Sequence, residues 1–212
     1  MPLRLAVGAA LAVLALAAGT GIAAPAATAT PPVSDVAAIQ ARLAALHYLA
    51  PNAVSGKIDW PTRQALLAFQ GWEGLPRNGI AGPVTRARLA GARVPQAGSG
   101  VGRRIEVHID RQVALLVAGA RVARVVHVST GAVATPTPTG RFRVFRKERE
   151  SWSVPFRVWL PWASYFSGGV ALHGHRTVPA YPASHGCVRI PLSDAAAVYA
   201  FARLGVTVAV LP

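Results

Sequence analysis

The sequence holds a single cysteine, Cys187, among 212 residues. One cysteine cannot form an intrachain disulfide, which excludes a disulfide-stapled secreted scaffold, and it excludes zinc fingers that need several cysteine ligands. Acidic residues are also scarce, with 8 Asp and Glu against 22 Lys and Arg and a formal net charge of +14. This excess predicts an anionic partner, such as nucleic acid, a membrane surface or an anionic cell-wall polymer. Hydrophobic residues make up 52% of the chain, which excludes wholesale disorder.

The first 29 residues have the pattern of a secretory signal peptide. Arg4 supplies a short positive region, residues 5–18 are apolar or glycine, and Ala27-Thr28-Ala29 fits a cleavage site of small residues. We therefore expect export to the cell envelope (periplasm or cell wall) or secretion, which argues against chromosomal DNA as the anionic partner. An uncleaved membrane anchor is the alternative, because the apolar stretch continues to Ala24.

Residues 34–92 predict a small helical module. Apolar residues recur at helical spacing over 36–49, a second helix is predicted over 61–72 with Pro61 in its first turn, and a short third helix is predicted over 83–92. No residue of this module has catalytic features. Residues 93–102 follow, rich in Gly, Pro and Ser, and predict a flexible linker.

The helical module contains an internal repeat. Residues 56–63 and 79–86 each begin with glycine and end in Thr-Arg, at a spacing of 23 residues. This pair of half-units resembles the peptidoglycan-binding domain 1 family, although Asp59-Trp60 stands where that family usually has Phe-Gly. The resemblance implies binding to peptidoglycan; a helical spacer without a ligand is the alternative.

From Arg103 onwards the hydrophobic pattern changes to the period of β-strands. Ile105, Val107 and Ile109 alternate with polar residues, and two β-rich runs flank a predicted turn at 118–120. Further strands are predicted over 141–150, 156–166, 168–175 and 206–212, with one helix over 194–204. We therefore expect an α+β chain of two domains, a small helical module followed by a mostly-β, β-sandwich-like catalytic domain over 103–212.

The lone cysteine lies in a run that favours chemistry over packing. Cys187 follows Ser184-His185-Gly186 and lies fourteen residues after His173. A neighbouring imidazole can take the thiol proton, and the thiolate can attack a carbonyl to form a thioester. Arg189 and the basic surroundings are expected to favour the thiolate. Two alternatives are a buried structural cysteine and a zinc site, although no CxxC or HExxH spacing is present.

Residues 103–212 resemble the L,D-transpeptidase catalytic domain of the YkuD family. The resemblance is carried by the His173-Gly174 pair, the run Ser184–Arg189, and the upstream runs Val128–Gly131 and Thr135–Gly140. It implies that Cys187 is the nucleophile and His173 the general base, with its ring oriented by a backbone carbonyl. His175 is a rival for the base, because only eleven residues separate His173 from His185.

The same resemblance implies supporting roles for further residues. The thiol loop and oxyanion hole are expected to involve His185, Ser184, Gly186 and Gly174. Arg189 is expected to bind a stem-peptide carboxylate, and residues 164–169 are expected to line the cleft, with Tyr165 and Ser167 contacting substrate. No metal or nucleotide cofactor is expected.

The implied function is that of an exported L,D-transpeptidase that forms 3→3 peptidoglycan cross-links through a cysteine thioester. Its expected partners are peptidoglycan stem peptides and anionic cell-wall polymers, with no nucleic acid and no obligate protein partner. A cysteine-dependent L,D-carboxypeptidase or hydrolase and a non-catalytic wall-binding protein are the alternatives. The acyl acceptor and the third stem residue stay open.

Overall fold

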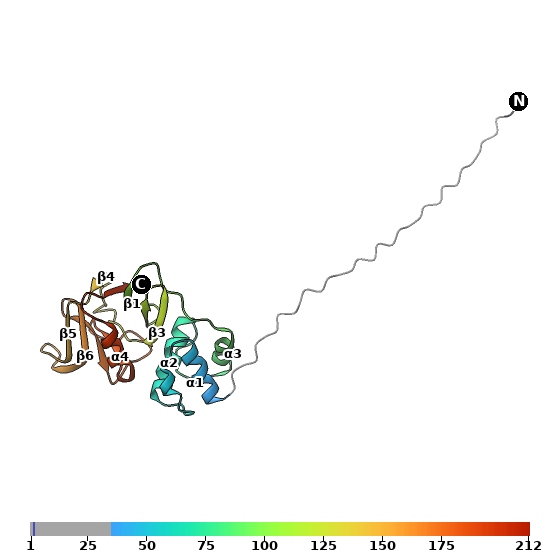
Figure 1. Cartoon of the computed structure of the whole chain (residues 1–212), viewed down its shortest axis with the longest axis horizontal. Helices are drawn as coiled ribbons and strands as arrows, with labels where there is room; N and C mark the ends of the chain where they lie inside the picture. Colours follow the sequence, from blue (N-terminus) through green and yellow to red (C-terminus); the bar gives the residue numbers. More distant parts are fainter. Residues whose placement is uncertain (1, 3–34) are drawn as a thin grey trace.

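The computed structural model describes residues 2 and 35–212 of the chain (Figure 1). Apart from residue 2, the predicted signal peptide over 1–29 lies outside the described residues. Within the described part of the chain, no helix combines the length and the apolar character that crossing a membrane requires.

The helical module contains the three predicted helices, α1 (Val36–Ala45), α2 (Trp60–Trp72) and α3 (Pro83–Gly91), with a 3₁₀ turn, η1 (Pro51–Ala53), after the first. Asp35 and Asp59 cap α1 and α2, because each carboxylate accepts a hydrogen bond from a backbone N–H three residues later. Helix α1 ends earlier than predicted, since His47 takes a left-handed φ of 68°. The apolar residues beyond it remain buried in the module.

The internal repeat has a common structural basis in both half-units. The fully buried amide of Gln40 donates to Thr62 Oγ1 at 2.7 Å, and that of Gln70 donates to Thr85 Oγ1 at 3.1 Å. Each glutamine Oε1 also accepts from the N–H of the glycine that opens its half-unit. Each half-unit is therefore joined to the preceding helix by buried hydrogen bonds, through the glycine of its loop and the threonine in the first turn of the next helix.

The β domain consists of two sheets and one helix, as predicted. The first sheet has the order β3-β2-β1-β9-β4 and the second the order β5-β6-β7-β8. The elements are β1 (Arg103–His108), β2 (Val113–Ala118), β3 (Arg121–His127), β4 (Gly140–Arg143), β5 (Arg146–Ser153), β6 (Val158–Ser167), β7 (Val170–His175), β8 (Val188–Pro191), α4 (Leu192–Phe201) and β9 (Thr207–Leu211).

The prediction of one strand over 141–150 is wrong, because the chain changes sheets there. The N–H of Val144 donates to the Val206 carbonyl at 2.9 Å, beside the first sheet, and the N–H of Phe145 donates to the Tyr165 carbonyl at 3.0 Å, beside the second. Strands β4 and β5 therefore lie in different sheets. Strand β8 was not predicted, since its four residues are too short to show alternation.

The two sheets face each other across an apolar core, which confirms the sandwich-like architecture. Ile105, Leu116 and Val208 from the first sheet and Leu172 and Ile190 from the second are buried in this core. Buried residues of α4 join the same cluster. Burial of these side chains supplies the hydrophobic free energy that holds the sandwich together.

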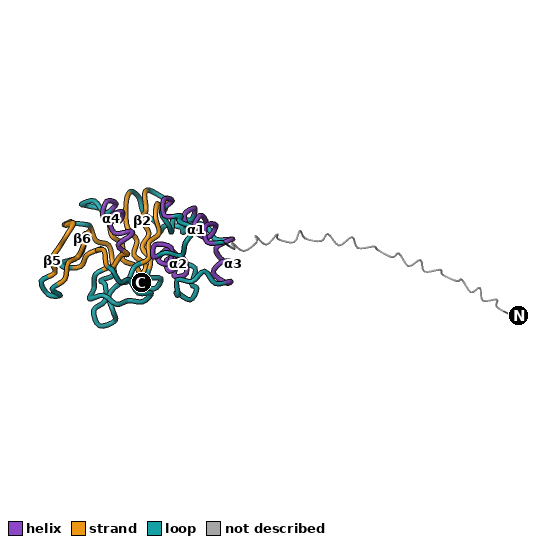
Figure 2. The backbone as a smooth tube through the Cα atoms, turned by 90° about the horizontal axis from the view of Figure 1, so that it is seen from below, coloured by secondary structure: helices purple, strands orange, loops and turns teal. Residues whose placement is uncertain are grey.

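The helical module packs on the outer face of the first sheet. Strand β2 is buried on both sides: Leu116 faces the sandwich core, while Val113 and Leu115 join a second core with Leu66 and Phe69 of α2. Burial on both faces explains the uninterrupted apolar run of β2. Figures 1 and 2 show α1, α2 and α3 at one end of the molecule and β5 and β6 at the other.

A glycine allows α2 to approach the sheet closely. A Cβ at Gly71 would lie 2.3 Å from the carbonyl oxygen of Arg111, so only glycine fits this contact. Arg111 Nη1 in turn donates to the Trp72 carbonyl at 2.8 Å, and its guanidinium lies over the Trp72 ring. The two modules thus share a core and a polar contact.

Residues 93–102 have no regular secondary structure but are held at several points. The buried guanidinium of Arg104 donates to the carbonyls of Gly98 and Gly100 and to Glu106 Oε1 at 2.6 Å. Burial by itself raises the pKa of Glu106, but the nearby His108 side chain and the hydrogen bonds from Gly98 and Arg104 outweigh it and lower that pKa to about 2. A buried ion pair therefore anchors the connection that the sequence suggested would be flexible.

Candidate active site

A cavity of about 620 Å³ lies on the outer face of the second sheet. Its lining includes the cysteine and the histidines that the sequence singled out, together with two arginines: Cys187, His173, His175, His185, Arg189 and Arg146. One wall is formed by the loop that precedes β8, and the opposite wall by the hairpin between β5 and β6. The cavity has the size and the convergent polar groups of a small-molecule or peptide site.

Cys187 is half-buried at the end of the loop that leads into β8. Its Sγ accepts a hydrogen bond from the N–H of Ala171 at 3.5 Å and lies 3.8 Å from the Gly169 carbonyl, to which the thiol can donate. Burial raises the thiol pKa, while the Ala171 N–H and the charge of Arg189 lower it by less. Arg189 therefore favours the thiolate as expected, but burial outweighs this effect and the thiol pKa of the free site is raised overall.

His173 is buried on β7, and its ring orientation follows the sequence expectation. Nδ1 lies 2.9 Å from the carbonyl oxygen of Gly174. A carbonyl only accepts hydrogen bonds, so Nδ1 carries the proton and Nε2 is left as the acceptor. Burial lowers the pKa of His173 to about 4, and the charge of Arg189 acts in the same direction. The ring is therefore neutral at neutral pH and able to take a proton.

Strand register brings His173 nearer to the thiol than His175. Strands β7 and β8 are parallel, with Leu172 opposite Val188 and His173 opposite Arg189, so Cys187 continues the register opposite Ala171. From the usual spacings of strands and residues, the Cα atoms of His173 and Cys187 lie about 8 Å apart, against about 14 Å for His175. His175 also bonds locally, since its Nδ1 lies 2.7 Å from the Thr177 carbonyl.

Residues 130–137 hold the loop that carries the cysteine by hydrogen bonds. The Ser184 N–H donates to the Thr130 carbonyl at 3.0 Å, and Ser184 Oγ bonds both the Gly186 N–H and the Cys187 carbonyl. Buried Thr137 Oγ1 donates to the Gly186 carbonyl at 2.8 Å. Gly186 has a φ of +109°, which side chains rarely adopt. Ser184 and Gly186 thus shape the loop, and both of their backbone N–H groups are already hydrogen-bonded, that of Ser184 to Thr130 and that of Gly186 to Ser184 Oγ.

Gly174 faces away from the cavity. A Cβ at this position would lie 2.9 Å from the Ala195 Cβ and 3.0 Å from a side-chain carbon of Leu192, both in α4. Glycine is therefore needed here because β7 and α4 pack closely. In the His-Gly pair, the histidine faces the cavity and the glycine lies against α4 on the other face of the sheet.

The other predicted contact residues are divided between cavity and framework. Tyr165 lines the cavity, and its hydroxyl lies 2.7 Å from Ser151 Oγ. His185 lines the cavity and stacks on Phe156, with ring centroids 4.6 Å apart. Ser167 pairs with Val170 at the end of β6 and does not lie among the residues that line the cavity.

The wall formed by the β5–β6 hairpin was missed by the sequence reasoning. Residues 152–156 and 158 of this hairpin line the cavity, and several are large and apolar yet exposed, such as Trp152 and Phe156. The high density of aromatic residues over 152–166 was the available signal, but it reads equally well as a buried strand. Within the described residues, no three His, Cys, Asp or Glu side chains gather as a metal-binding group.

The fold and the site define a β-sandwich domain with a cysteine and a buried histidine in one cavity, and comparisons with known proteins give its family. The family model for the L,D-transpeptidase catalytic domain, YkuD, matches residues 102–210, and the model for a peptidoglycan binding domain matches residues 32–89. The chain belongs to the L,D-transpeptidase family. Peptidoglycan is the polymer that both matches indicate.

Solved structures agree with this assignment. An L,D-transpeptidase from Xylanimonas cellulosilytica is 33% identical, with a TM-score of 0.77 over 88% of this chain and 100% of that one. An L,D-transpeptidase from Stackebrandtia nassauensis is 28% identical, with a TM-score of 0.55 over 82% of this chain and 89% of that one. Among curated proteins, none matches the chain significantly.

Proposed function

We propose that this protein is an exported L,D-transpeptidase that joins peptidoglycan stems by 3→3 cross-links through a thioester on Cys187. The observation that carries the proposal is the placement of the Cys187 thiol and the neutral, oriented imidazole of His173 in one cavity. Only a neutral imidazole can act as a base, and the lowered pKa of His173 keeps it neutral at neutral pH.

The first half of the reaction forms the acyl-enzyme. Nε2 of His173 takes the proton from the Cys187 thiol as Sγ attacks the carbonyl carbon of the third stem residue. The bond between this carbon and the nitrogen of the terminal D-alanine then breaks, and the protonated imidazole returns its proton to the leaving amine. Arg189, opposite His173 in the register, is suited to bind the carboxylate of the leaving D-alanine.

The second half transfers the acyl group to an acceptor. An amine of a neighbouring stem attacks the thioester carbon and loses its proton to His173, the carbon–sulfur bond breaks, and Sγ takes the proton back from His173, which gives the cross-link and restores the thiol and the neutral imidazole. Because the free thiol has a raised pKa, deprotonation is expected to accompany substrate binding and not to precede it. Ser184 and Gly186 support the step by holding the loop that presents Sγ, and His185 in the same loop packs on Phe156.

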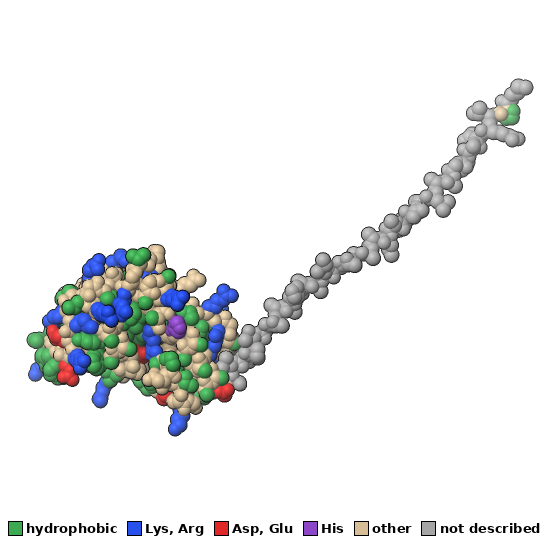
Figure 3. Space-filling view, in the orientation of Figure 1, with side chains coloured by type: hydrophobic (Ala, Val, Ile, Leu, Met, Phe, Trp, Pro, Cys, Tyr) green, Lys and Arg blue, Asp and Glu red, His purple; other side chains and the backbone are tan. Residues whose placement is uncertain are grey.

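The helical module and the charge are consistent with a wall-bound enzyme. Figure 3 shows Lys and Arg side chains spread over one face with few Asp and Glu side chains between them. Peptidoglycan carboxylates and anionic wall polymers would attract such a surface in a salt-dependent manner. Export by the predicted signal peptide would bring the enzyme to this polymer.

The proposal is tested by intact mass spectrometry after addition of a tetrapeptide stem. We expect a mass increase equal to the stem minus D-alanine, located on Cys187 and absent in Cys187→Ala, which should still sediment with peptidoglycan. With an acceptor amine in excess we expect a cross-linked product. Shortened stems without cross-links would favour the L,D-carboxypeptidase, and an unreactive thiol in folded protein would favour a wall-binding protein without catalysis.

A further inference from the structure

Gln112 is a fully buried polar residue at the end of the turn that joins β1 to β2, residues 109–112. Its backbone takes a left-handed φ of 51°, which a residue other than glycine adopts only where the surrounding structure holds it. A buried amide also needs hydrogen-bond partners within the protein. The partners of Gln112 therefore show what this residue holds in place.

The Gln112 amide makes three hydrogen bonds, and two of them go to Thr130. Nε2 donates to Thr130 Oγ1 at 2.7 Å and to the Ile109 carbonyl at 2.6 Å. Oε1 accepts from the Thr130 N–H at 2.8 Å. Thr130 is itself fully buried. Because a donor and an acceptor of one amide both bind Thr130, Gln112 fixes the position of this residue and also its orientation.

Thr130 in turn holds the nucleophile loop, residues 184–187. Its carbonyl oxygen accepts from the N–H groups of Ala183 and Ser184, at 2.9 and 3.0 Å. Ser184 Oγ then donates to the carbonyl of Cys187. Consecutive hydrogen bonds therefore connect the β1–β2 turn, through Gln112 and Thr130, with the backbone of the nucleophile.

Both chain neighbours of Gln112 contact the helical module. Arg111 Nη1 donates to the Trp72 carbonyl, and α2 lies so close that a Cβ on Gly71 would come within 2.3 Å of the Arg111 carbonyl oxygen. On the other side of Gln112, Val113 is buried in the core that the first sheet shares with α2. The turn is therefore held between α2 and the nucleophile loop, and a shift of α2 against the turn would displace Gln112 as well.

We propose that Gln112 is a positioning residue for the Cys187 thiol and that the helical module holds Gln112 in place. On this assignment the module contributes to the rate of acylation and not only to retention on peptidoglycan. Gln112 does not line the cavity and acts through Thr130 and Ser184. The inference rests on the proposed function, because it requires Cys187 to be the nucleophile.

The first experiment compares Gln112→Met with Gln40→Met in two reactions of Cys187, acylation by a soluble tetrapeptide stem and alkylation by iodoacetamide. Gln40 is the matched control, because its amide is also fully buried and bonds a threonine hydroxyl and backbone groups, all within the helical module. Each substitution removes the hydrogen bonds of one buried amide, so both should lower stability to urea to a similar extent.

The two reactions should respond to Gln112→Met in opposite directions. We expect acylation to slow about tenfold, since misplacement by about 1 Å can cost about 100-fold. Alkylation should become about threefold faster, because release of the loop exposes the thiol and its pKa, which burial raises, then falls towards the ordinary value. Gln40→Met should change neither rate in protein that circular dichroism shows to be folded. A loss of stability alone does not produce opposite shifts.

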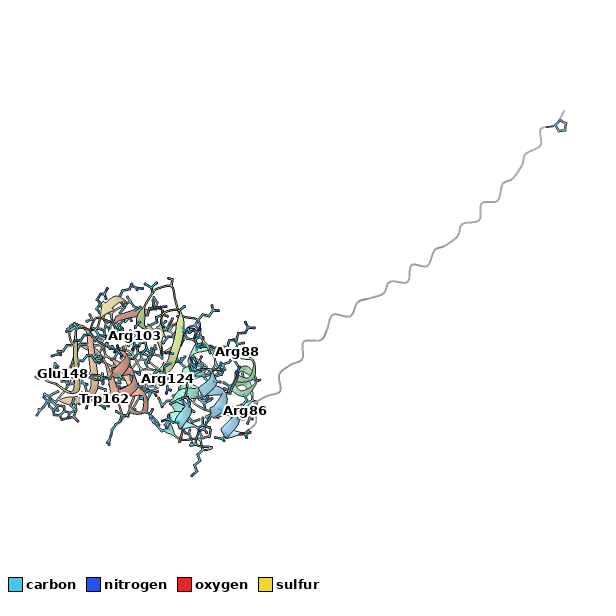
Figure 4. All side chains as sticks on the ribbon, viewed as in Figure 1. Arg86, Arg88, Arg103, Arg124, Glu148 and Trp162 are labelled. Carbon is cyan, nitrogen blue, oxygen red and sulfur yellow. The ribbon has the colours of Figure 1, made fainter. Side chains whose placement is uncertain are left out.

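The second experiment tests the hold of the helical module with a pair of glycines. Gly71→Ala puts a methyl group against the Arg111 carbonyl, and we expect it to slow acylation about fivefold. Gly91→Ala is the matched control and should leave the rate unchanged, because a Cβ there meets no atom within 4 Å. Gly91 ends α3, and Figure 4 shows Arg86 and Arg88 of this helix at the end of the molecule away from the second sheet.

The outcomes distinguish the two proposals. Acylation of Gln112→Met at the wild-type rate, or alkylation that does not become faster, would overturn the positioning role and leave the acyl-enzyme intact. Thr130→Val removes one of the same hydrogen bonds and should shift both rates in the same directions, which keeps the test open where Gln112→Met does not fold. An unchanged acylation rate in Gly71→Ala would overturn the role of the helical module. Absence of any adduct on Cys187 in folded wild-type protein would instead refute the proposed function.

Discussion

The two walls of the cavity are built differently. The wall that carries the nucleophile is tied into the fold: Ser184, Thr137 and Thr130 bind its loop by buried hydrogen bonds. The opposite wall, the tip of the β5–β6 hairpin, has exposed apolar side chains, with Phe156 and Val158 each nearly half accessible. Catalytic geometry is therefore set by the first wall, whereas the second supplies contact surface that a long ligand would cover.

The largest effect is expected at the wall that carries the nucleophile, where substitution of His173 is compared with substitution of His175. His173→Gln should lower the rate of acyl-enzyme formation about 1000-fold, because it removes the base at the position nearest the thiol. His175→Gln should lower it by less than about tenfold, since His175 lies farther along β7 and bonds to Thr177. Mass spectrometry of the acylated protein measures both rates, and the opposite order would make His175 the base.

The loop support is tested by Thr137→Val, which keeps the side-chain shape but removes the hydroxyl. Thr137 Oγ1 accepts from the Gly131 N–H and donates to the Gly186 carbonyl, each at 2.8 Å. Leaving these groups without partners should lower the free energy of unfolding by about 2–4 kcal/mol and slow acylation as well. Urea unfolding measures the first effect. Exposed Thr139→Val is the control and should change neither quantity.

The buried histidines beside this wall predict a loss of stability in mild acid. Burial lowers the pKa of His127 and of His173 from 6.5 to about 4, so the unfolded chain binds more protons between these values. Stability is therefore full above pH 6.5 and falls as the pH drops towards 4, by about 2 kcal/mol per histidine at pH 5. Glu106, with its pKa of about 2, contributes above pH 4.5 and loses its contribution only at lower pH.

Urea unfolding at pH 7 and pH 5 checks this dependence. His127→Gln should remove about half of the difference in unfolding free energy between the two pH values. An unchanged difference would mean that His127 is not protonated on unfolding in this range.

The smallest effect is expected at the exposed wall. Phe156→Ala removes a ring that stacks on His185 and lines the cavity. We expect acylation by a tetrapeptide stem to slow about fivefold through lost apolar contact, while alkylation of Cys187 by iodoacetamide is not slowed. Kinetics with the two reagents measure both, and equal slowing of stem and small reagent would show that the hairpin also sets the thiol geometry.

Much of the fold could be predicted because most helices and strands have a hydrophobic spacing or a turn residue that is visible within a few neighbouring residues of the sequence. Helical spacing located α2 and α3, alternation located β1, and the glycine turn at 118–120 separated β2 from β3. The break between β4 and β5 could not be predicted, because Val144 and Phe145 are continuous with their neighbours in pattern and differ only in the sheet that each joins.

Part of the candidate site could also be predicted from the sequence, namely the residues that lie in its short motifs. The run around Cys187 and the His-Gly pair pointed to the cavity, because neighbouring residues in these motifs are also neighbours in space. Arg146 and Phe156 were missed, since Arg146 reaches the cavity through strand pairing across the second sheet and Phe156 through the turn of the β5–β6 hairpin. Ser167 was included because it follows Tyr165, but the irregular pairing between them moves it out of the lining.

The sequence by itself determined which residue types can perform the chemistry, the order of the two modules, and the basic character of the surface. Tertiary structure decided that both modules share a core through β2, that His173 and not His175 lies near the thiol, and that the cavity has two arginines. The physical reason is that composition and periodicity depend on neighbours in the chain, whereas pKa values and catalytic distances depend on which strands pair and which side chains are buried together.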